Sequence, residues 1–260
     1  MVNLIEVVTS ARANGKSADN GSIYLVFEYF EMDLAGLSSW TELHAEEIRC
    51  YTRQLLSALA YLHENDVCHR DIKCSNILIS GRHQLKVTDF GLARRMGLRG
   101  VEGQASVPRT YTNRVVTLWY RAPELLLGSE HYDMGVDMWS VGCIIAELIM
   151  GTALLQGKAE LDQLRKIFEL CGTPMRESHW KDIGTLPNQM WLCELKDFNS
   201  TIVKDAIKGS KRMAIKEPPG RLAEYLQKKC PKDAFDLIRH LLALDPSTRR
   251  STSLTGGNER

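Results

Sequence analysis

The sequence predicts an α+β fold in which strands come first and helices dominate afterwards. Residues 2–8 and 22–29 are apolar and rich in β-branched or aromatic side chains, which is typical of strands, and the polar stretch 9–21 predicts a long loop between them. From Thr41 to His63, apolar side chains recur every three or four residues, the spacing of a helix with one buried face. The members of this stripe are Ile48, Tyr51, Leu55, Leu59 and Leu62.

Shorter patterns complete the expected fold. The β-like runs 77–79 and 85–87 flank Gly81 and predict a small hairpin. Further helices are expected at about 136–150, 160–171 and 232–243. The helices are therefore grouped in the later part of the chain, and do not alternate with the strands.

Composition excludes several classes of protein. Lys and Arg total 33 against 32 for Asp and Glu, so the net charge of +1 provides no field for direct nucleic-acid binding. The seven cysteines are odd in number and never in Cys-x-x-Cys spacing, which argues against a disulfide framework or a zinc site. The longest apolar run, 141–150, contains Glu147 and is too short to span a bilayer, so we expect no membrane partner.

Four residues in the middle of the chain have the chemistry that phosphoryl transfer needs. Asp71 is the candidate base for an acceptor hydroxyl, and Lys73 would place positive charge near the transferred group. Asn76 and Asp89 are the candidate Mg²⁺ ligands, because this cation prefers hard oxygen atoms. Any one of these residues alone would be read as an ordinary loop residue.

Their order and spacing are specific. His69-Arg70-Asp71, Asn76, Asp89-Phe90-Gly91 and Ala122-Pro123-Glu124 follow one another as the catalytic-loop, metal-loop and downstream motifs of protein kinases do. His69 is expected to pack the loop and not to act as a base. The sequence therefore predicts a protein-kinase-like fold, consisting mostly of the helical C-lobe with a two-strand remnant of the N-lobe.

A closer resemblance is found in the stretch 112–124, TNRVVTLWYRAPE, which is similar to the activation segment of cyclin-dependent kinases. Mitogen-activated kinases would have Thr-x-Tyr where Thr112-Asn113-Arg114 stands. Residues 21–30 and 33–37 resemble the transcription-elongation branch of the cyclin-dependent family. The resemblance implies a proline-directed Ser/Thr kinase that uses Mg²⁺ and ATP, with the RNA polymerase II C-terminal repeats as a candidate substrate.

The resemblance also implies the nucleotide contacts. Phe27 corresponds to the gatekeeper, and the backbone at Glu28 and Phe30 would bind adenine. Asp33 would meet the ribose, and Leu78 would form the floor under the adenine ring.

Two further roles follow from the activation segment. Thr112 resembles the activating phosphosite, whose phosphate would pair with Arg70 and Arg94. Val115 and Val116 would form the substrate proline pocket, where strained backbone turns a carbonyl away from the substrate and so favours proline, which has no N–H.

Three residues are expected to support the fold of the site. Asp137 resembles the aspartate that anchors the catalytic loop through hydrogen bonds, although capping of its helix is the alternative. Glu124 resembles one partner of a buried ion pair, and Arg249 would be the other.

We expect residues 1–30 to be the N-lobe remnant and hinge, 31–250 the C-lobe, and 251–260 a polar tail. The glycine-rich loop, the strand lysine and the helix glutamate of the family are missing, as is the helix that contacts cyclin. Three hypotheses remain open: an active kinase whose full-length form binds cyclin, a noncatalytic binding or decoy module, and residual catalysis by this chain. The uncovered half-cleft predicts a chain that aggregates or is bound to a partner. A nuclear location is expected, with the cytoplasm as a second one.

Overall fold

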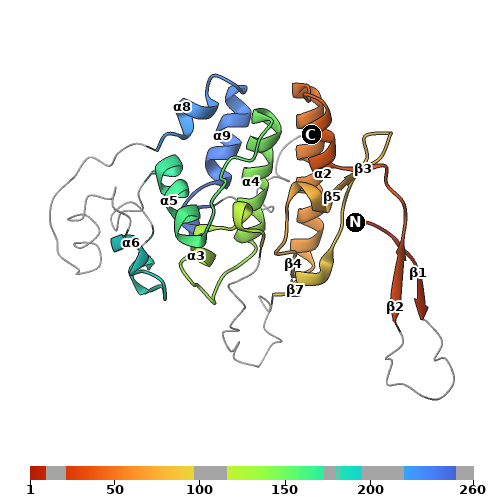
Figure 1. Ribbon diagram of the computed structural model, residues 1–260, viewed down its shortest axis with the longest axis horizontal. Helices are drawn as coiled ribbons and strands as arrows, with labels where there is room; N and C mark the ends of the chain where they lie inside the picture. Colours follow the sequence, from red (N-terminus) through yellow and green to blue (C-terminus); the bar gives the residue numbers. More distant parts are fainter. Residues whose placement is uncertain (10–21, 97–115, 173–179, 181, 195–219, 250–260) are drawn as a thin grey trace, which may run out of the picture.

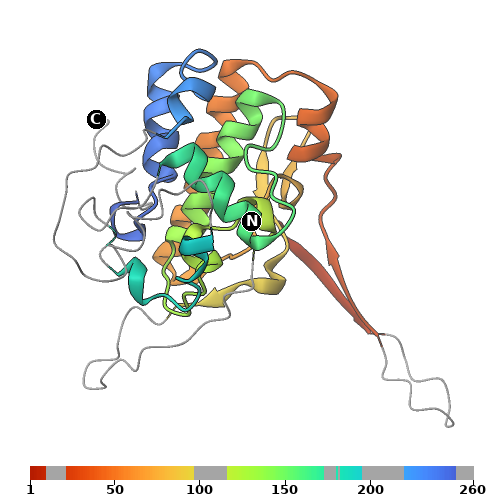
Figure 2. The same cartoon turned by 60° about the vertical axis from the view of Figure 1, so that its left-hand side comes forward.

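The computed structural model describes residues 1–9, 22–96, 116–172, 180, 182–194 and 220–249. A group of helices forms the body of the molecule, and the hairpin of β1 and β2 projects from it (Figures 1 and 2). The α+β fold expected from the sequence is confirmed, with short strands before and among the first helices and helices in the later part.

Three helices carry most of the core. Helix α4 (Gly135–Met150) contacts both α2 (Ala45–Glu64) and α9 (Lys232–Leu241). Nearly every side chain of α4 is buried, which agrees with its almost uninterrupted apolar sequence. Within the described part of the chain, no helix is long and apolar enough to cross a membrane.

Helix α2 confirms four of the five members of the predicted stripe, whereas Ile48 is only partly buried, and the helix begins later than Thr41. The side chains of Tyr51, Leu55, Leu59 and Leu62 are buried. The helix starts at Ala45 because Glu47 accepts a hydrogen bond from the His44 N–H at 2.9 Å, which closes a capping box. The predicted helix 232–243 similarly ends at Leu241.

Helix α1 (Leu34–Trp40) was not predicted. It is only seven residues long and contains Gly36, so its sequence gives little helical periodicity. Its first turn is capped by Asp33, which accepts a hydrogen bond from the Gly36 N–H at 2.7 Å. The other helices among the described residues are α3 (Pro123–Leu126), α5 (Glu160–Cys171), α6 (Trp191–Glu194) and α8 (Leu222–Leu226).

Short 3₁₀ turns connect several of these elements. They are η1 (Cys74–Asn76), η2 (Phe90–Leu92), η3 (Leu118–Tyr120), η4 (Ile183–Thr185) and η5 (Pro246–Thr248).

The described strands form three small antiparallel sheets. Strands β1 (Leu4–Thr9) and β2 (Ile23–Phe27) pair with each other, and β4 (Val67–Cys68) pairs with β7 (Arg94–Arg95). The predicted hairpin of β5 (Ile77–Ile79) and β6 (Leu85–Val87) is confirmed, and β3 (Met32–Asp33) extends it to a three-stranded sheet.

Both faces of the β1–β2 hairpin are exposed. Ile5 and Ile23 are 66% and 68% exposed, and all eleven residues of the two strands are classed as exposed. Such a contiguous apolar surface is unusual for a monomer in water, and an isolated hairpin is marginal there. That the chain aggregates or is bound to a partner stays a prediction, and the exposure of these strands is the structural feature that bears on it.

Candidate functional site

The loop between β4 and β5 brings three of the predicted site residues together. The ammonium of Lys73 donates to Oδ2 of Asp71 at 2.8 Å, and Nδ2 of Asn76 donates to the same oxygen at 3.0 Å. Asn76 Nδ2 also donates to the Asp71 backbone carbonyl at 2.8 Å, which closes the loop around the carboxylate. Asp71 and Asn76 are buried, so these hydrogen bonds hold the carboxylate in one orientation.

Thr117 completes this arrangement, although sequence reasoning assigned it no role. Its hydroxyl donates to Oδ1 of Asp71 at 3.1 Å and accepts from the Lys73 ammonium at 3.1 Å. Its backbone N–H donates to the same Asp71 oxygen at 3.2 Å. The only signal in the sequence was its position inside the stretch 112–124, because a threonine separated by 46 residues gives no local pattern.

The surroundings of Asp71 keep its carboxylate charged. Burial alone would raise the pKa of Asp71, but the hydrogen bond and charge of Lys73 and the two hydrogen bonds from Thr117 lower it below its ordinary value. The group is therefore ionised at neutral pH, as a proton acceptor must be.

Asp89 lies beside Asn76 through backbone pairing. The Thr88 N–H donates to the Asn76 carbonyl at 3.0 Å, so the predicted metal ligand Asp89 is one residue from this bond. Asp89 has a left-handed backbone with φ of 63°, and its side chain is exposed and accepts from the Gly91 N–H at 3.3 Å. The Asp89 carboxylate and the Asn76 amide oxygen are both ligand types that fit Mg²⁺, which in such sites takes its other ligands from phosphates and water.

Asp137 anchors the catalytic loop, as predicted. Its carboxylate accepts the backbone N–H groups of His69 and Arg70 at 2.9 and 2.8 Å, and it is almost completely buried. Nε2 of His63 lies 2.9 Å from the same carboxylate, a contact that the helical stripe did not reveal. Burial by itself would raise the pKa of Asp137. The pKa nevertheless lies below its ordinary value, chiefly because of the hydrogen bond and charge of His63. His69 packs the loop, with Nε2 at 3.0 Å from the Thr88 carbonyl.

The predicted ion pair of Glu124 and Arg249 is also formed. Two hydrogen bonds of 2.6 and 3.0 Å join the guanidinium to the two carboxylate oxygens, and both side chains are buried. The guanidinium also donates to the backbone carbonyls of Gly135 and Ala243. This bidentate pair ties α3 to the segment that follows α9.

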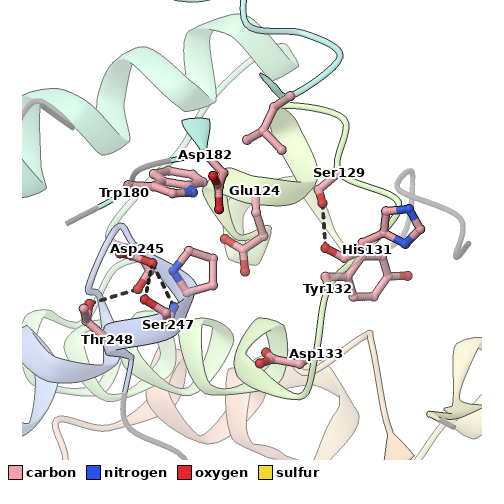
Figure 3. Close-up of a pocket in the computed structure, with 12 residues that line it drawn as sticks. Glu124, Ser129, His131, Tyr132, Asp133, Trp180, Asp182, Asp245, Ser247 and Thr248 are labelled. Carbon is pink, nitrogen blue, oxygen red and sulfur yellow. Dashed lines mark hydrogen bonds between the residues drawn. The ribbon is translucent and has the colours of Figure 1, made fainter. Parts of the chain in front are cut away.

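A pocket of about 650 Å³ is lined in part by Glu124 (Figure 3). Glu124 is held by Arg249, and Asp245 accepts the Ser247 N–H and hydroxyl at 2.9 and 2.8 Å. Asp71 and Asp89 are not among the described residues that line the pocket. Glu124 and Asp245 are thus used for hydrogen bonds within the fold, and neither is one of the predicted catalytic or metal-binding residues.

The residues predicted to contact the nucleotide lie on β2, on β3, on β5 and on the segment between β2 and β3. Asp33 pairs with Leu78 across β3 and β5, so the predicted ribose contact and the adenine floor are neighbours. Glu28 accepts hydrogen bonds through its carboxylate, and its own N–H donates to the Asn3 carbonyl at 3.1 Å. Phe27 is 46% exposed at the end of β2.

Arg94 lies on β7, and Arg70 follows the neighbouring strand β4 by two residues. Arg94 is paired with Cys68 in the β4–β7 sheet, two residues before Arg70. The buried guanidinium of Arg70 donates to the Leu92 carbonyl and the Tyr132 hydroxyl, both at 2.8 Å. Thr112 lies outside the described residues, so its pairing with these arginines stays a prediction.

Val116 has the strained backbone that was predicted for this position. Its φ of 68° is rare for a β-branched residue, and its side chain is buried. Arg121, to which the sequence analysis assigned no role, donates to the Val116 carbonyl through Nε and Nη2 at 3.2 and 3.0 Å, which turns this carbonyl toward the protein. Val115 lies outside the described residues.

Comparisons with known proteins agree with this site. A family described as "Protein kinase domain" matches residues 1–255. Cyclin-dependent kinase C-2 of Arabidopsis thaliana is 41% identical over 258 residues, covering 96% of this chain and 45% of the relative. Cyclin-dependent kinase C-2 of Oryza sativa subsp. japonica is 42% identical over 261 residues, again covering 96% of this chain and 45% of the relative.

A solved structure has the same fold. A chain of the yeast RNA Pol II CTD kinase CTDK-1 complex superposes with a TM-score of 0.74 at 34% identity, covering 95% of this chain and 72% of that chain. The present chain spans about half the length of the two curated relatives. On these matches, the chain belongs to the protein kinase family, and its sequence places it with the cyclin-dependent kinases.

Proposed function

We propose that the protein is an ATP-dependent, proline-directed serine/threonine kinase of the cyclin-dependent type. The γ-phosphoryl group of Mg-ATP would be transferred to the hydroxyl of a Ser-Pro or Thr-Pro site. The observation that carries this proposal is the convergence of Lys73, Asn76 and Thr117 on the carboxylate of Asp71, within 3.2 Å. This geometry holds a charged base in a single orientation, with a cation beside it.

Each residue has a chemical task in this proposal. Asp71 orients the acceptor hydroxyl and takes its proton, while Lys73 supplies positive charge on the side where the phosphoryl group arrives. Thr117 keeps both side chains in place. Asn76 and Asp89 would hold Mg²⁺, which neutralises phosphate charge when it is bound.

The preference for proline rests on Val116. Because the Val116 carbonyl is directed to Arg121, an amide N–H following the acceptor residue would lose its hydrogen-bond partner. Proline has no such N–H, so it avoids the cost of an unpaired donor. The similar CTDK-1 complex is named as a yeast RNA Pol II CTD kinase, and this similarity supports the polymerase repeats as the substrate class to test first.

We further propose a nuclear location and activation by a cyclin in the whole protein. These proposals rest on the similarity to cyclin-dependent kinases. The activating phosphate would be on Thr112, with Arg70 and Arg94 as its partners.

A peptide-transfer assay tests the function. The chain is incubated with Mg-ATP, with and without a cyclin, and with paired Ser-Pro and Ser-Ala peptides. Asp71→Asn is expected to reduce transfer by about 10²- to 10⁴-fold, because proton transfer is lost, whereas the exposed Asp233→Asn is the matched control. Transfer that is insensitive to Asp71→Asn would show a contaminating kinase and contradict the proposal.

The same assay tests the preference for proline. The wild-type chain should favour Ser-Pro over Ser-Ala by about tenfold, the value of one unmade hydrogen bond. Arg121→Met should reduce this ratio, because the Val116 carbonyl would lose the guanidinium that holds it and could turn back toward the substrate. Equal rates on both peptides with the wild-type chain would exclude a proline-directed enzyme.

A noncatalytic binding or decoy module is the second candidate function. The observation that favours it is the exposed apolar surface of β1 and β2, a surface suited to a protein partner. A chain that binds substrate peptides or kinase regulators, yet transfers no phosphate with cyclin present, would support this candidate instead.

A further inference from the structure

Lys86 joins the predicted adenine-binding segment to the hairpin that leads to Asp89. Its ammonium lies 2.5 Å from Oε1 of Glu28 and 5.6 Å from the centroid of the Phe30 ring. The Lys86 and Glu28 side chains are 24% and 26% exposed, so the pair is partly shielded from water. One lysine therefore contacts both residues whose backbone is expected to bind adenine.

The position of Lys86 in its sheet makes this contact informative. Across β3, β5 and β6, Asp33 pairs with Leu78 and Leu78 pairs with Lys86. The predicted ribose contact, the adenine floor and Lys86 thus form one row of the sheet. Neighbouring strands are held at a fixed spacing, so Lys86, at the end of this row, can set the position of the segment that contains Glu28 and Phe30.

The first residues of the chain form hydrogen bonds with the same region. The Asn3 N–H donates to Oε1 of Glu28 at 2.7 Å, and the Glu28 N–H donates to the Asn3 carbonyl at 3.1 Å. The Val2 N–H donates to the Val87 carbonyl at 3.0 Å. The pKa of Glu28 is below its ordinary value, mainly because of the hydrogen bond from Lys86 and next because of that from Asn3. The Glu28 carboxylate is therefore charged at neutral pH.

We propose that Lys86 is a positioning residue for the nucleotide, which through Glu28 and Phe30 holds the adenine-binding segment in register with Leu78, Asp33 and Asp89. The inference rests on the proposed kinase function and adds to it a specific residue outside the recognised motifs. Lys86 itself touches neither substrate nor metal in this proposal. Its effect is to keep the adenine-binding segment at Glu28 and Phe30 at a constant distance from the predicted metal ligand Asp89. This lowers the entropy that is lost when nucleotide binding orders the two parts of the site.

The experiment compares Lys86→Met, Lys86→Arg and Glu28→Gln with a control pair elsewhere on the surface. The control is Arg49→Met, because Arg49 and Asp233 also form a long-range ion pair between two elements, at 3.5 Å and far more exposed. The dissociation constant of Mg-ADP is measured for each variant of this 260-residue chain, together with amide hydrogen exchange of the segments that contain Val2, Asn3 and Glu28.

Lys86→Met is expected to weaken Mg-ADP binding about threefold to fivefold and to accelerate exchange at Asn3 and Glu28. Lys86→Arg should restore binding to within about twofold of the wild type, because the charge is kept. In the transfer assay the KM for ATP should rise while kcat at saturating ATP stays within about twofold, which a general loss of stability would not produce. The loss of Mg-ADP binding free energy in the double variant Lys86→Met and Glu28→Gln should be smaller than the sum of the losses in the two single variants.

Two outcomes would overturn the proposal in different ways. If the wild-type chain binds Mg-ADP and Lys86→Met behaves like Arg49→Met in both measurements, Lys86 has no positioning role. If the wild-type chain binds no nucleotide, the proposed function fails and the positioning role with it, while the exchange data still report whether Lys86 restrains the segment.

Discussion

The hydroxyl of Thr117 lies 3.1 Å from a carboxylate oxygen of Asp71, and the backbone N–H of the same threonine donates to that oxygen. Thr117 therefore connects the segment that carries the strained Val116 directly to the catalytic loop. A shift of this segment would change the hydrogen bonding, and hence the basicity, of the predicted base.

Thr117→Val should reduce kcat for peptide phosphorylation by about tenfold or more, because a hydrogen bond to a charged group is lost while the side-chain shape is kept. Thr117→Ser keeps the hydroxyl and should recover most of the rate. Steady-state kinetics at saturating ATP measures both. A valine variant as fast as the serine variant would show that the hydroxyl has no role.

Lys73→Met should move the acid limb of the pH–rate profile to higher pH. Lys73 lowers the pKa of Asp71, so its removal raises that pKa toward or above the ordinary value. In the wild-type chain the depressed pKa also stabilises the fold above the unfolded-state pKa, and this contribution is lost as pH falls through the folded-state pKa. The profile of kcat/KM between pH 4 and 8 provides the measurement, with Lys73→Arg as the charge-conserving control.

Arg249→Met should destabilise the fold by about 3–5 kcal/mol, because Glu124 would remain as a buried and unpaired charge. The double variant Glu124→Gln and Arg249→Met should cost less than the sum of the single changes. Chemical denaturation gives the free energy of unfolding. Arg49→Met, which removes an exposed pair, should cost no more than about 1 kcal/mol, and equal losses in both arginine variants would contradict the assignment.

Glu147→Gln should stabilise the fold increasingly as pH rises from 4 to 7. Burial raises the pKa of Glu147, opposed by hydrogen bonds from Tyr120 and Cys74, and the Tyr120 hydroxyl donates to its carboxylate at 2.8 Å. In the wild-type chain, the stability that protonated Glu147 contributes is fully present below the unfolded-state pKa, and it is lost as pH rises through the folded-state pKa. Glutamine accepts the Tyr120 hydrogen bond without a charge. Urea denaturation at several pH values should therefore show a growing difference in favour of the variant, and a constant difference would contradict a raised pKa.

Periodicity predicted the long helices well because their apolar stripes are long enough to average over local exceptions. Tyr51, Leu55, Leu59 and Leu62 are buried in α2 as their spacing required. Helix α1 was not predicted, because its seven residues give no periodic signal. Its start depends on the single N-cap hydrogen bond that Asp33 accepts from Gly36. Strand β3 was missed for the same reason, since two residues form a strand only when β5 lies beside them.

The sequence by itself determined the family, because the order and spacing of its motifs are specific to protein kinases, and it predicted Asp71, Asn76 and Asp89 as site residues. Only the tertiary structure shows that Thr117 contacts Asp71 and that Lys86 contacts Glu28. Their partners lie 46 and 58 residues away, and such contacts depend on how helices and sheets pack, which no local pattern records.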